Sequence, residues 1–322
     1  MAKRRNDFLY YAANLIGFSM AIYFIAYFVL SFLSGLFLPL FFKGATLANP
    51  IAVPEWVMGL VNLILSQGSL ALAYLIIRLG QTDNVQCNIS LAIPHDNRLW
   101  LFVPIFLGIG IFLNVITTLF ARFASTVTSY KPPAAMPLPN GALGLIIYFI
   151  AICVVPAIME ELLVRGAMQG LLMHWGPWFA ILVSSFAFAL LHSDITAMPS
   201  IFILSIILGL TAYCTQSIIP GMFLHFSNNV LAFIVNFAVQ KGDSAPTQAF
   251  TVYIMAVIIV SALICITLAV KSKVYSQLKA IPRFHDPKNR QSRFERLVCA
   301  PVYIAMMVML SIRAILPLVI SK

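Results

Sequence analysis

The chain has 322 residues, of which 61% are hydrophobic and only 9% charged, and its mean hydropathy is +0.96. Soluble domains have about 45–50% apolar and about 25% charged residues, so this composition excludes a water-soluble globular protein. The net charge of +10 does not indicate nucleic-acid binding, because many basic residues cluster beside apolar runs, at 3–5 and within 271–296. Basic residues in such places set the topology of a membrane protein. The partner that the composition predicts is therefore a lipid bilayer.

The apolar runs predict the fold class. About 20 residues of helix cross the hydrocarbon core of a bilayer, and the chain contains nine apolar runs near that length. We therefore expect an all-α integral membrane protein, a polytopic helical bundle of about 8–9 transmembrane helices. The expected spans are 10–40, 56–79, 99–121, 142–159, 178–193, 199–219, 221–239, 250–270 and 298–320. The run at 178–193 is short for a full crossing, and the boundary at Pro220 and Gly221 could be a hairpin within the membrane.

The loops and charges divide the chain into three parts. Residues 1–130 form N-terminal transmembrane helices of unassigned role, 140–240 contain all the candidate chemistry, and 241–322 form C-terminal helices with a basic loop at 271–297. Eight crossings from a cytoplasmic N-terminus would bring this loop to the cytoplasm, as the positive-inside rule requires. We expect a multi-pass protein with a cytoplasmic N-terminus, and the short loops favour a bacterial cell membrane. The end of the 142–159 span that carries Glu160 is then cytoplasmic.

Two adjacent carboxylates and a guanidinium stand within one apolar stretch, at Glu160, Glu161 and Arg165. A charge at bilayer depth costs roughly 2.5–3.5 kcal/mol on insertion scales, so three of them suggest a function. On a helix, Glu161 and Arg165 are one turn apart and can pair, while Glu160 points about 100° away. Desolvation and a neighbouring like charge raise the pKa of a carboxylate, which suits a general base near neutral pH. The alternative is a helix end at the headgroup level with three solvated charges.

Two later apolar segments also carry polar side chains at helical spacing. Phe188 and His192 share one helix face, and His225 and Asn229 share another. A single intramembrane histidine or asparagine can simply hydrogen-bond between packed helices. A carboxylate pair, two histidines and an asparagine on three successive segments instead favour one common pocket.

In this order, the three motifs resemble the CPBP family of intramembrane glutamic endopeptidases, which are also called CAAX proteases, bacteriocin-processing enzymes or the Abi family. The motifs are E-E-x-x-x-R from Glu160, F-x-x-x-H from Phe188 and H-x-x-x-N from His225. The resemblance covers roughly 140–240, and every key position of the three motifs is kept. It implies an endopeptidase that hydrolyses peptide bonds of a membrane-associated protein or peptide, without a cofactor.

The resemblance also implies the role of each residue. Glu160 and His192 would hold and activate a water molecule, and His225 and Asn229 would stabilise the oxyanion. The supporting residues would be Glu161, Arg165 and Phe188.

Other mechanisms and functions stay open. Glu160, His192 and His225 could form a zinc site with an open position, although no H-E-x-x-H motif occurs. The protein could instead be a non-catalytic membrane scaffold, or a bacteriocin-immunity factor that binds a sensor or a peptide. A proton-coupled transporter is a third possibility, since intramembrane ionisable groups often relay protons. The sequence does not indicate an oligomeric state.

Overall fold

The computed structural model describes residues 2–43, 53–87, 90–94, 101–128, 130–131, 137–241, 245–271 and 287–320. These ranges contain helices, turns and two isolated β-bridges, but no strand, which confirms an all-α polytopic membrane protein. The α-helices are α1 (Ala2–Phe41), α2 (Glu55–Leu63), α3 (Ser69–Leu79), α4 (Phe102–Val127), α5 (Ala142–Phe149), α6 (Val155–Glu161), α7 (Gly170–Leu172), α8 (Pro177–Leu191), α9 (Met198–Thr215), α10 (Ile219–Lys241), α11 (Ala245–Lys271), α13 (Pro287–Val298) and α14 (Pro301–Ile320).

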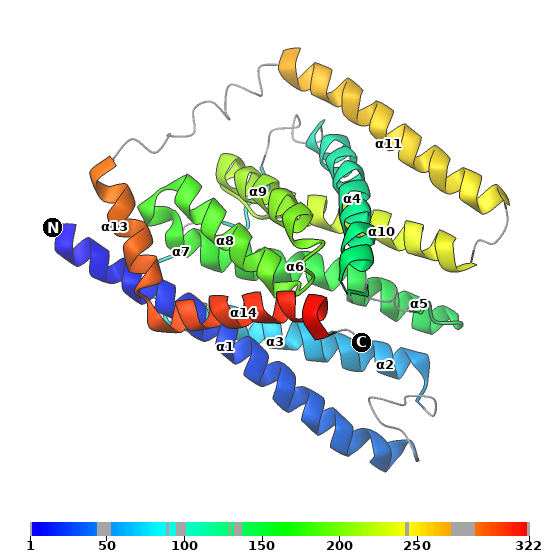
Figure 1. The fold of residues 1–322 in the computed structure, drawn as a ribbon, viewed down its shortest axis with the longest axis horizontal. Coiled ribbons are helices and arrows are strands. Elements are labelled where there is room, and N and C mark those ends of the chain that lie inside the picture. Colours follow the sequence, from blue (N-terminus) through cyan, green and yellow to red (C-terminus); the bar gives the residue numbers. More distant parts are fainter. Residues whose placement is uncertain are drawn as a thin grey trace.

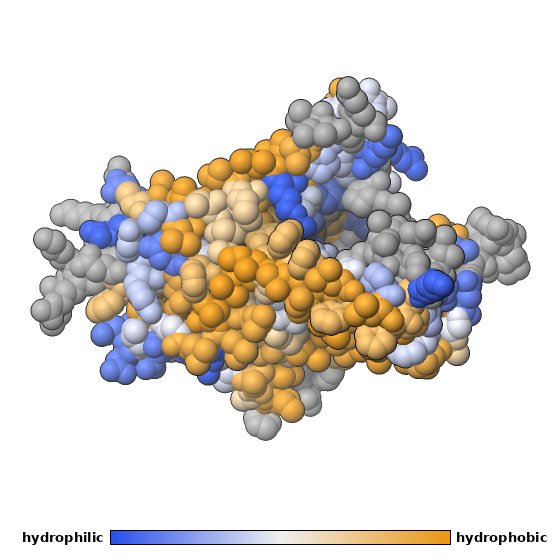
Figure 2. All heavy atoms as spheres, turned by 90° about the horizontal axis from the view of Figure 1, so that it is seen from below, coloured by the Kyte–Doolittle hydropathy of each residue, from blue (hydrophilic) through white to orange (hydrophobic). Residues whose placement is uncertain are grey.

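Seven of the described helices are long and apolar enough to cross a membrane, and two apolar stretches are shorter, Pro177–Leu191 in α8 and Pro301–Pro317 in α14. Large apolar side chains on the outside agree with a lipid surrounding, for example Phe28, Leu40 and Phe41, which are 72%, 74% and 78% exposed. Figure 2 shows apolar residues over the middle of one face and hydrophilic residues mainly toward its ends. Water would not tolerate so large an apolar surface.

The helix that carries the charged stretch differs from the prediction. The span expected at 142–159 continues to Trp175 as Ala142–Trp175, with π-helical segments at Ile150–Val154 and Leu162–Gln169. Apolar residues resume directly after the carboxylates, so the helix does not end there. Glu160 therefore lies near the middle of a long helix, and the expected helix end beside Glu160 is wrong. Single π turns inside α-helices frequently occur at functional sites.

Part of the basic loop expected at 271–297 is helical. Residues 272–286 lie outside the described residues, but Pro287–Val298 forms helix α13. This helix packs against α1 and α14, and Arg293 donates a hydrogen bond from Nη1 to the Trp175 carbonyl at 2.6 Å. The segment is thus attached to the helix that carries the charged stretch.

The N-terminal helices lie against the predicted core. Helix α1 runs along α3 and α14, and α3 contacts the π-helical segment Leu162–Gln169 (Figure 1). A Cβ atom at Gly17 would lie 2.5 Å from the backbone nitrogen of Tyr303, so only glycine allows α1 and α14 to cross so closely. On the other side, α4 packs against α9, α10 and α11, and α11 is outermost.

A tight turn joins α9 and α10. Gln216 adopts φ 51°, and α10 begins at Ile219, so Pro220 lies in the first turn of a helix, where proline is tolerated. The turn is held by Ser90, whose hydroxyl donates to the Gln216 carbonyl and whose carbonyl accepts from the Ile218 amide. The turn thus anchors the start of α10, the helix that carries His225.

Candidate active site

A buried polar stripe runs along the helix after Glu160. Glu161, Arg165 and Gln169 follow at one-turn intervals, and all three are fully buried. The ion pair expected within the helix is present, with Arg165 Nη1 2.6 Å from Glu161 Oε1. Arg165 also donates from Nη2 to the hydroxyl and carbonyl of Ser205 on α9, and Gln169 donates to the Gly209 carbonyl one turn further along. Helix α9 thus replaces solvent for these side chains. The sequence analysis missed Gln169, although its spacing from Arg165 could have revealed it.

Helix α10 brings His225 to both carboxylates. The His225 Nδ1 atom is 3.0 Å from Glu161 Oε1, and Nε2 is 3.7 Å from Glu160 Oε2. Because a carboxylate only accepts hydrogen bonds, His225 Nδ1 carries the proton that it donates to Glu161 Oε1. A Cβ atom at Gly221, one turn earlier, would lie 3.0 Å from Glu161 Oε2. The bare backbone at Gly221 therefore lets α10 approach the buried carboxylate.

His192 is held at the end of α8. The helix ends at Leu191, and His192 follows its last turn, close to the end of the expected span 178–193. Its Nδ1 is 3.0 Å from the Phe188 carbonyl, which can only accept, so Nδ1 carries a proton and Nε2 remains available as an acceptor. Ser193, with φ 57°, then turns the chain away.

A small cluster fixes the loop after His192. Asp194 Oδ1 accepts hydrogen bonds from the Tyr130 hydroxyl at 3.0 Å and from the Thr196 hydroxyl at 2.8 Å and backbone amide at 2.9 Å. Burial raises the pKa of Tyr130, and Asp194 adds to this, so the phenol keeps its proton and remains a donor. The loop that follows α8 is thus tied to the segment before α5.

Phe188 joins the three motifs in space. Its ring lies edge-on to His192 with centroids 4.6 Å apart, and 6.1 Å from the ring of His225. The Arg165 guanidinium carbon lies 5.0 Å from the centre of the same ring, a cation–π arrangement. Phe188 thus lies beside Arg165 and both imidazoles.

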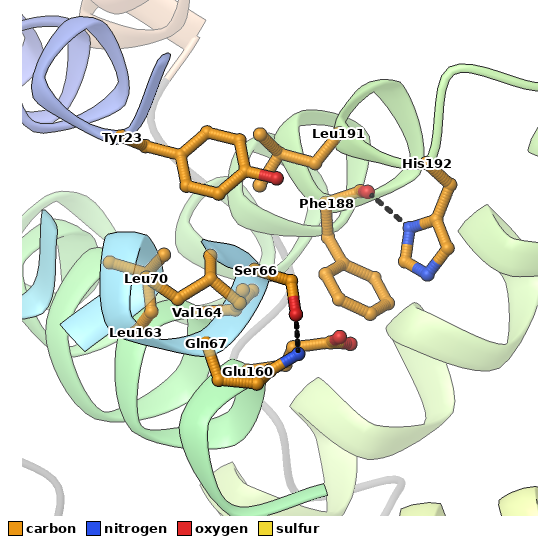
Figure 3. Close-up of a pocket in the computed structure, with 10 residues that line it drawn as sticks. All are labelled: Tyr23, Ser66, Gln67, Leu70, Glu160, Leu163, Val164, Phe188, Leu191 and His192. Carbon is orange, nitrogen blue, oxygen red and sulfur yellow. Dashed lines mark hydrogen bonds between the residues drawn. The ribbon is translucent and has the colours of Figure 1, made fainter. Parts of the chain in front are cut away.

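A cavity of about 130 Å³ lies beside these side chains (Figure 3). Glu160 and His192 both line it, as expected of a shared pocket. The full lining comprises Tyr23, Ser66, Gln67, Leu70, Glu160, Leu163, Val164, Phe188, Leu191 and His192. Four of these, from α1, the π-helical segment Ile64–Gly68 and α3, belong to the N-terminal helices that the sequence analysis left without a role.

The remaining predicted residues lie outside this lining. His225 reaches the site through its contacts with the two carboxylates, whereas Asn229 lies one turn further along α10, partly buried. In the part of the chain that the structure describes, no three His, Cys, Asp or Glu side chains are grouped so as to hold a metal ion. Glu160, His192 and His225 are therefore not arranged as a set of zinc ligands.

A second cavity, of about 340 Å³, lies between α4, α10 and α11. Asn114, Asn228 and Asn236 line it among apolar residues, and no predicted site residue does. The smaller cavity is the candidate active site, because it alone of the two adjoins the carboxylate and histidine cluster.

The fold and this site define a class: a polytopic helical membrane protein with carboxylates and histidines grouped beside a small cavity. Residues 142–231 of the chain match the family described as type II CAAX prenyl endopeptidase Rce1-like. The match confirms the resemblance to the CPBP family and supports a CAAX-type protease. It includes Glu160, His192, His225 and Asn229, whereas α1 to α4 and the helices after α10 lie outside it. No curated protein and no solved structure matched the chain.

Proposed function

We propose that the protein is an intramembrane endopeptidase that cleaves a membrane-associated protein or peptide with a water molecule activated by Glu160 and His192. The observation that carries this proposal is that both side chains, from separate helices, line one cavity. The family match over residues 142–231 supports peptide hydrolysis as the reaction.

In this mechanism Glu160 is the general base. It removes a proton from the water molecule as the oxygen attacks the peptide carbonyl, and it then delivers the proton to the leaving amine. His192 orients the water through Nε2, because its Nδ1 proton is already donated to the Phe188 carbonyl. The result is two shorter chains with one water consumed.

The developing oxyanion needs donors. His225 donates through Nδ1 to Glu161, so its Nε2 becomes a donor only when the ring carries both protons. The side-chain amide of Asn229 is the second donor in this proposal. Its role rests on its place one turn after His225 and on the family match. Each such donor contributes about 100–1,000-fold in rate.

The proposed substrate is a peptide held at the membrane by a lipid or by its own apolar segment. The family name points to prenylated CAAX proteins, and a bacteriocin or peptide precursor is the corresponding substrate in a bacterial cell membrane. The exposed apolar side chains of the helices suit substrates that arrive through the bilayer.

The test is cleavage of a farnesylated CAAX peptide and of a membrane-presented peptide library by the purified protein. We expect cleavage by the wild type, and a loss of about 100-fold or more for Glu160→Gln and for His192→Ala, since general acid–base catalysis contributes about 10²–10⁴-fold. Glu295→Gln, which changes an exposed carboxylate on α13, is the matched control and should keep wild-type activity.

A zinc chelator distinguishes the two mechanisms. Activity that survives chelation supports the glutamate-activated water, whereas activity lost on chelation and restored by zinc would replace it with metal catalysis. If no peptide is cleaved and Glu160→Gln also leaves the phenotype of the host cell unchanged, the protein is a scaffold and not an enzyme.

A further inference from the structure

Gln67 is a buried amide that lines the cavity and has no role in the mechanism above. It lies in the π-helical segment Ile64–Gly68, between α2 and α3, and is only 8% exposed. Its Oε1 atom has no hydrogen-bond partner among the described residues. A buried acceptor without a partner lowers stability, so its presence at a cavity points to a donor that arrives from outside.

The neighbouring serine fixes the orientation of this amide. The Ser66 hydroxyl donates its proton to the Asn62 carbonyl at 2.8 Å, so toward Gln67 it can only accept. Gln67 Nε2 lies at 3.5 Å from this hydroxyl oxygen, as the dashed line in Figure 3 shows. The amide nitrogen is therefore turned to Ser66, and Oε1 is left as a free acceptor. In Figure 3 this amide and the Glu160 carboxylate lie on the same side of the cavity.

The chemistry of the proposed reaction supplies the missing donor. A peptide must leave its helical conformation before a base and water can reach its carbonyl, and unwinding frees the backbone N–H groups that helical hydrogen bonds had satisfied. Inside a bilayer no bulk water can bind these groups. Amide oxygens of the enzyme are suitable acceptors because they are neutral and do not change the charge beside Glu160.

Resting on the proposed function, we propose that Gln67 is a substrate-positioning residue. Its Oε1 accepts a hydrogen bond from a backbone N–H next to the scissile bond and so holds the extended peptide against Glu160 and His192. Gln67 lies outside residues 142–231, so the family match does not assign it. The N-terminal helices thereby gain a function, as one wall of the substrate site.

The experiment combines a variant of the enzyme with a variant of the substrate. Gln67→Met keeps the length of the side chain but removes the acceptor. On a farnesylated CAAX peptide it should raise KM about tenfold with little change in kcat, because a hydrogen bond made equally in the bound peptide and the transition state affects binding alone. Peptides in which one amide next to the scissile bond is replaced by an ester lack single N–H groups. One of them should lower kcat/KM about tenfold for the wild type and not further for Gln67→Met.

The chain offers a matched control. Gln169 is also a buried glutamine whose Oε1 has no partner among the described residues, but it faces Gly209 on α9 and does not line the cavity. Gln169→Met should therefore keep the wild-type KM and the full ester penalty.

Several results would overturn the inference. One is an unchanged KM in Gln67→Met. Another is a fall in kcat alone, which would mean that the Gln67 amide binds the attacking water and not the peptide. A third is a further loss of kcat/KM when Gln67→Met is given the ester peptide. If Gln67→Met does not fold, the ester-substituted peptides are tested on the wild type alone. If none of them lowers kcat/KM, the proposed hydrogen bond does not exist. Cleavage by the wild type together with any of these results leaves the proposed function standing, whereas no wild-type cleavage of any peptide removes both proposals.

Discussion

Arg165 is a fully buried cation whose partners come from its own helix and from α9. Removing a guanidinium and a carboxylate from water is expensive, and their attraction repays that cost only with good geometry and further hydrogen bonds. Here Ser205 supplies those hydrogen bonds. The arrangement rigidly orients Glu161, and through it His225, so the pair serves the position of the histidine more than the stability of the fold.

At the residue scale, Arg165→Met should destabilise the protein by about 3–5 kcal/mol, because it leaves the Glu161 carboxylate buried without its cation. The double variant Glu161→Gln and Arg165→Met should be more stable than Arg165→Met, since no unpaired charge remains. Thermal unfolding of the purified protein in detergent measures both. Arg122→Met, at an exposed arginine of α4, is the control and should change stability little. Equal losses in the single and double variants would contradict the role of the buried charge.

At the element scale, the close approach of α10 to the charged helix depends on Gly221. In Gly221→Ala the new methyl group would meet Glu161 Oε2 at 3.0 Å, so either the carboxylate or α10 must shift. We expect a loss of about 1–3 kcal/mol in stability, as for other overpacked sites, and lower peptidase activity because His225 moves with α10.

The control for this prediction is another glycine in a helix. A Cβ atom at Gly35 in α1 would meet nothing within 4 Å. Gly35→Ala should therefore be neutral, or stabilise by about 0.5–1 kcal/mol through the better helix propensity of alanine. Both variants are compared by thermal unfolding and peptide cleavage. A Gly221→Ala protein as stable and active as Gly35→Ala would show that the contact with Glu161 is not limiting.

At the scale of the whole molecule, the number of crossings depends on α8. Its 15 residues span about 22 Å, less than the roughly 30 Å of a hydrocarbon core. If α8 crosses, eight crossings separate the N-terminus from Lys271, and both lie in the cytoplasm, as the basic residues predict. Single cysteines at Asn6 and Lys271, in a chain whose five native cysteines are replaced, should then resist a membrane-impermeant thiol reagent until the cells are permeabilised.

Other labelling patterns have equally clear meanings. Labelling of only one of the two cysteines in intact cells would mean an odd number of crossings, with α8 failing to cross. Labelling of both would reverse the predicted orientation of the protein.

Features that depend on composition and on local spacing could be predicted without a structure. The abundance of apolar residues requires a bilayer, and helical periodicity places Glu161 with Arg165 and Phe188 with His192, because residues four apart share a helix face whatever surrounds them. Where partners lie far apart in the chain, periodicity predicts which residues share a helix face but not which other helix packs against that face. Only the tertiary structure showed that His225 meets the buried carboxylates.

Two further features also depended on packing. Arg165 can be fully buried because Ser205 on α9 replaces solvent as its hydrogen-bond acceptor, which no local pattern reveals. Gln67 reaches the cavity because α3 lies against the charged helix, a long-range contact between segments that share no motif. Candidate residues and the helix faces that they share could thus be named from the chain alone, whereas the walls of the cavity depend on helix packing.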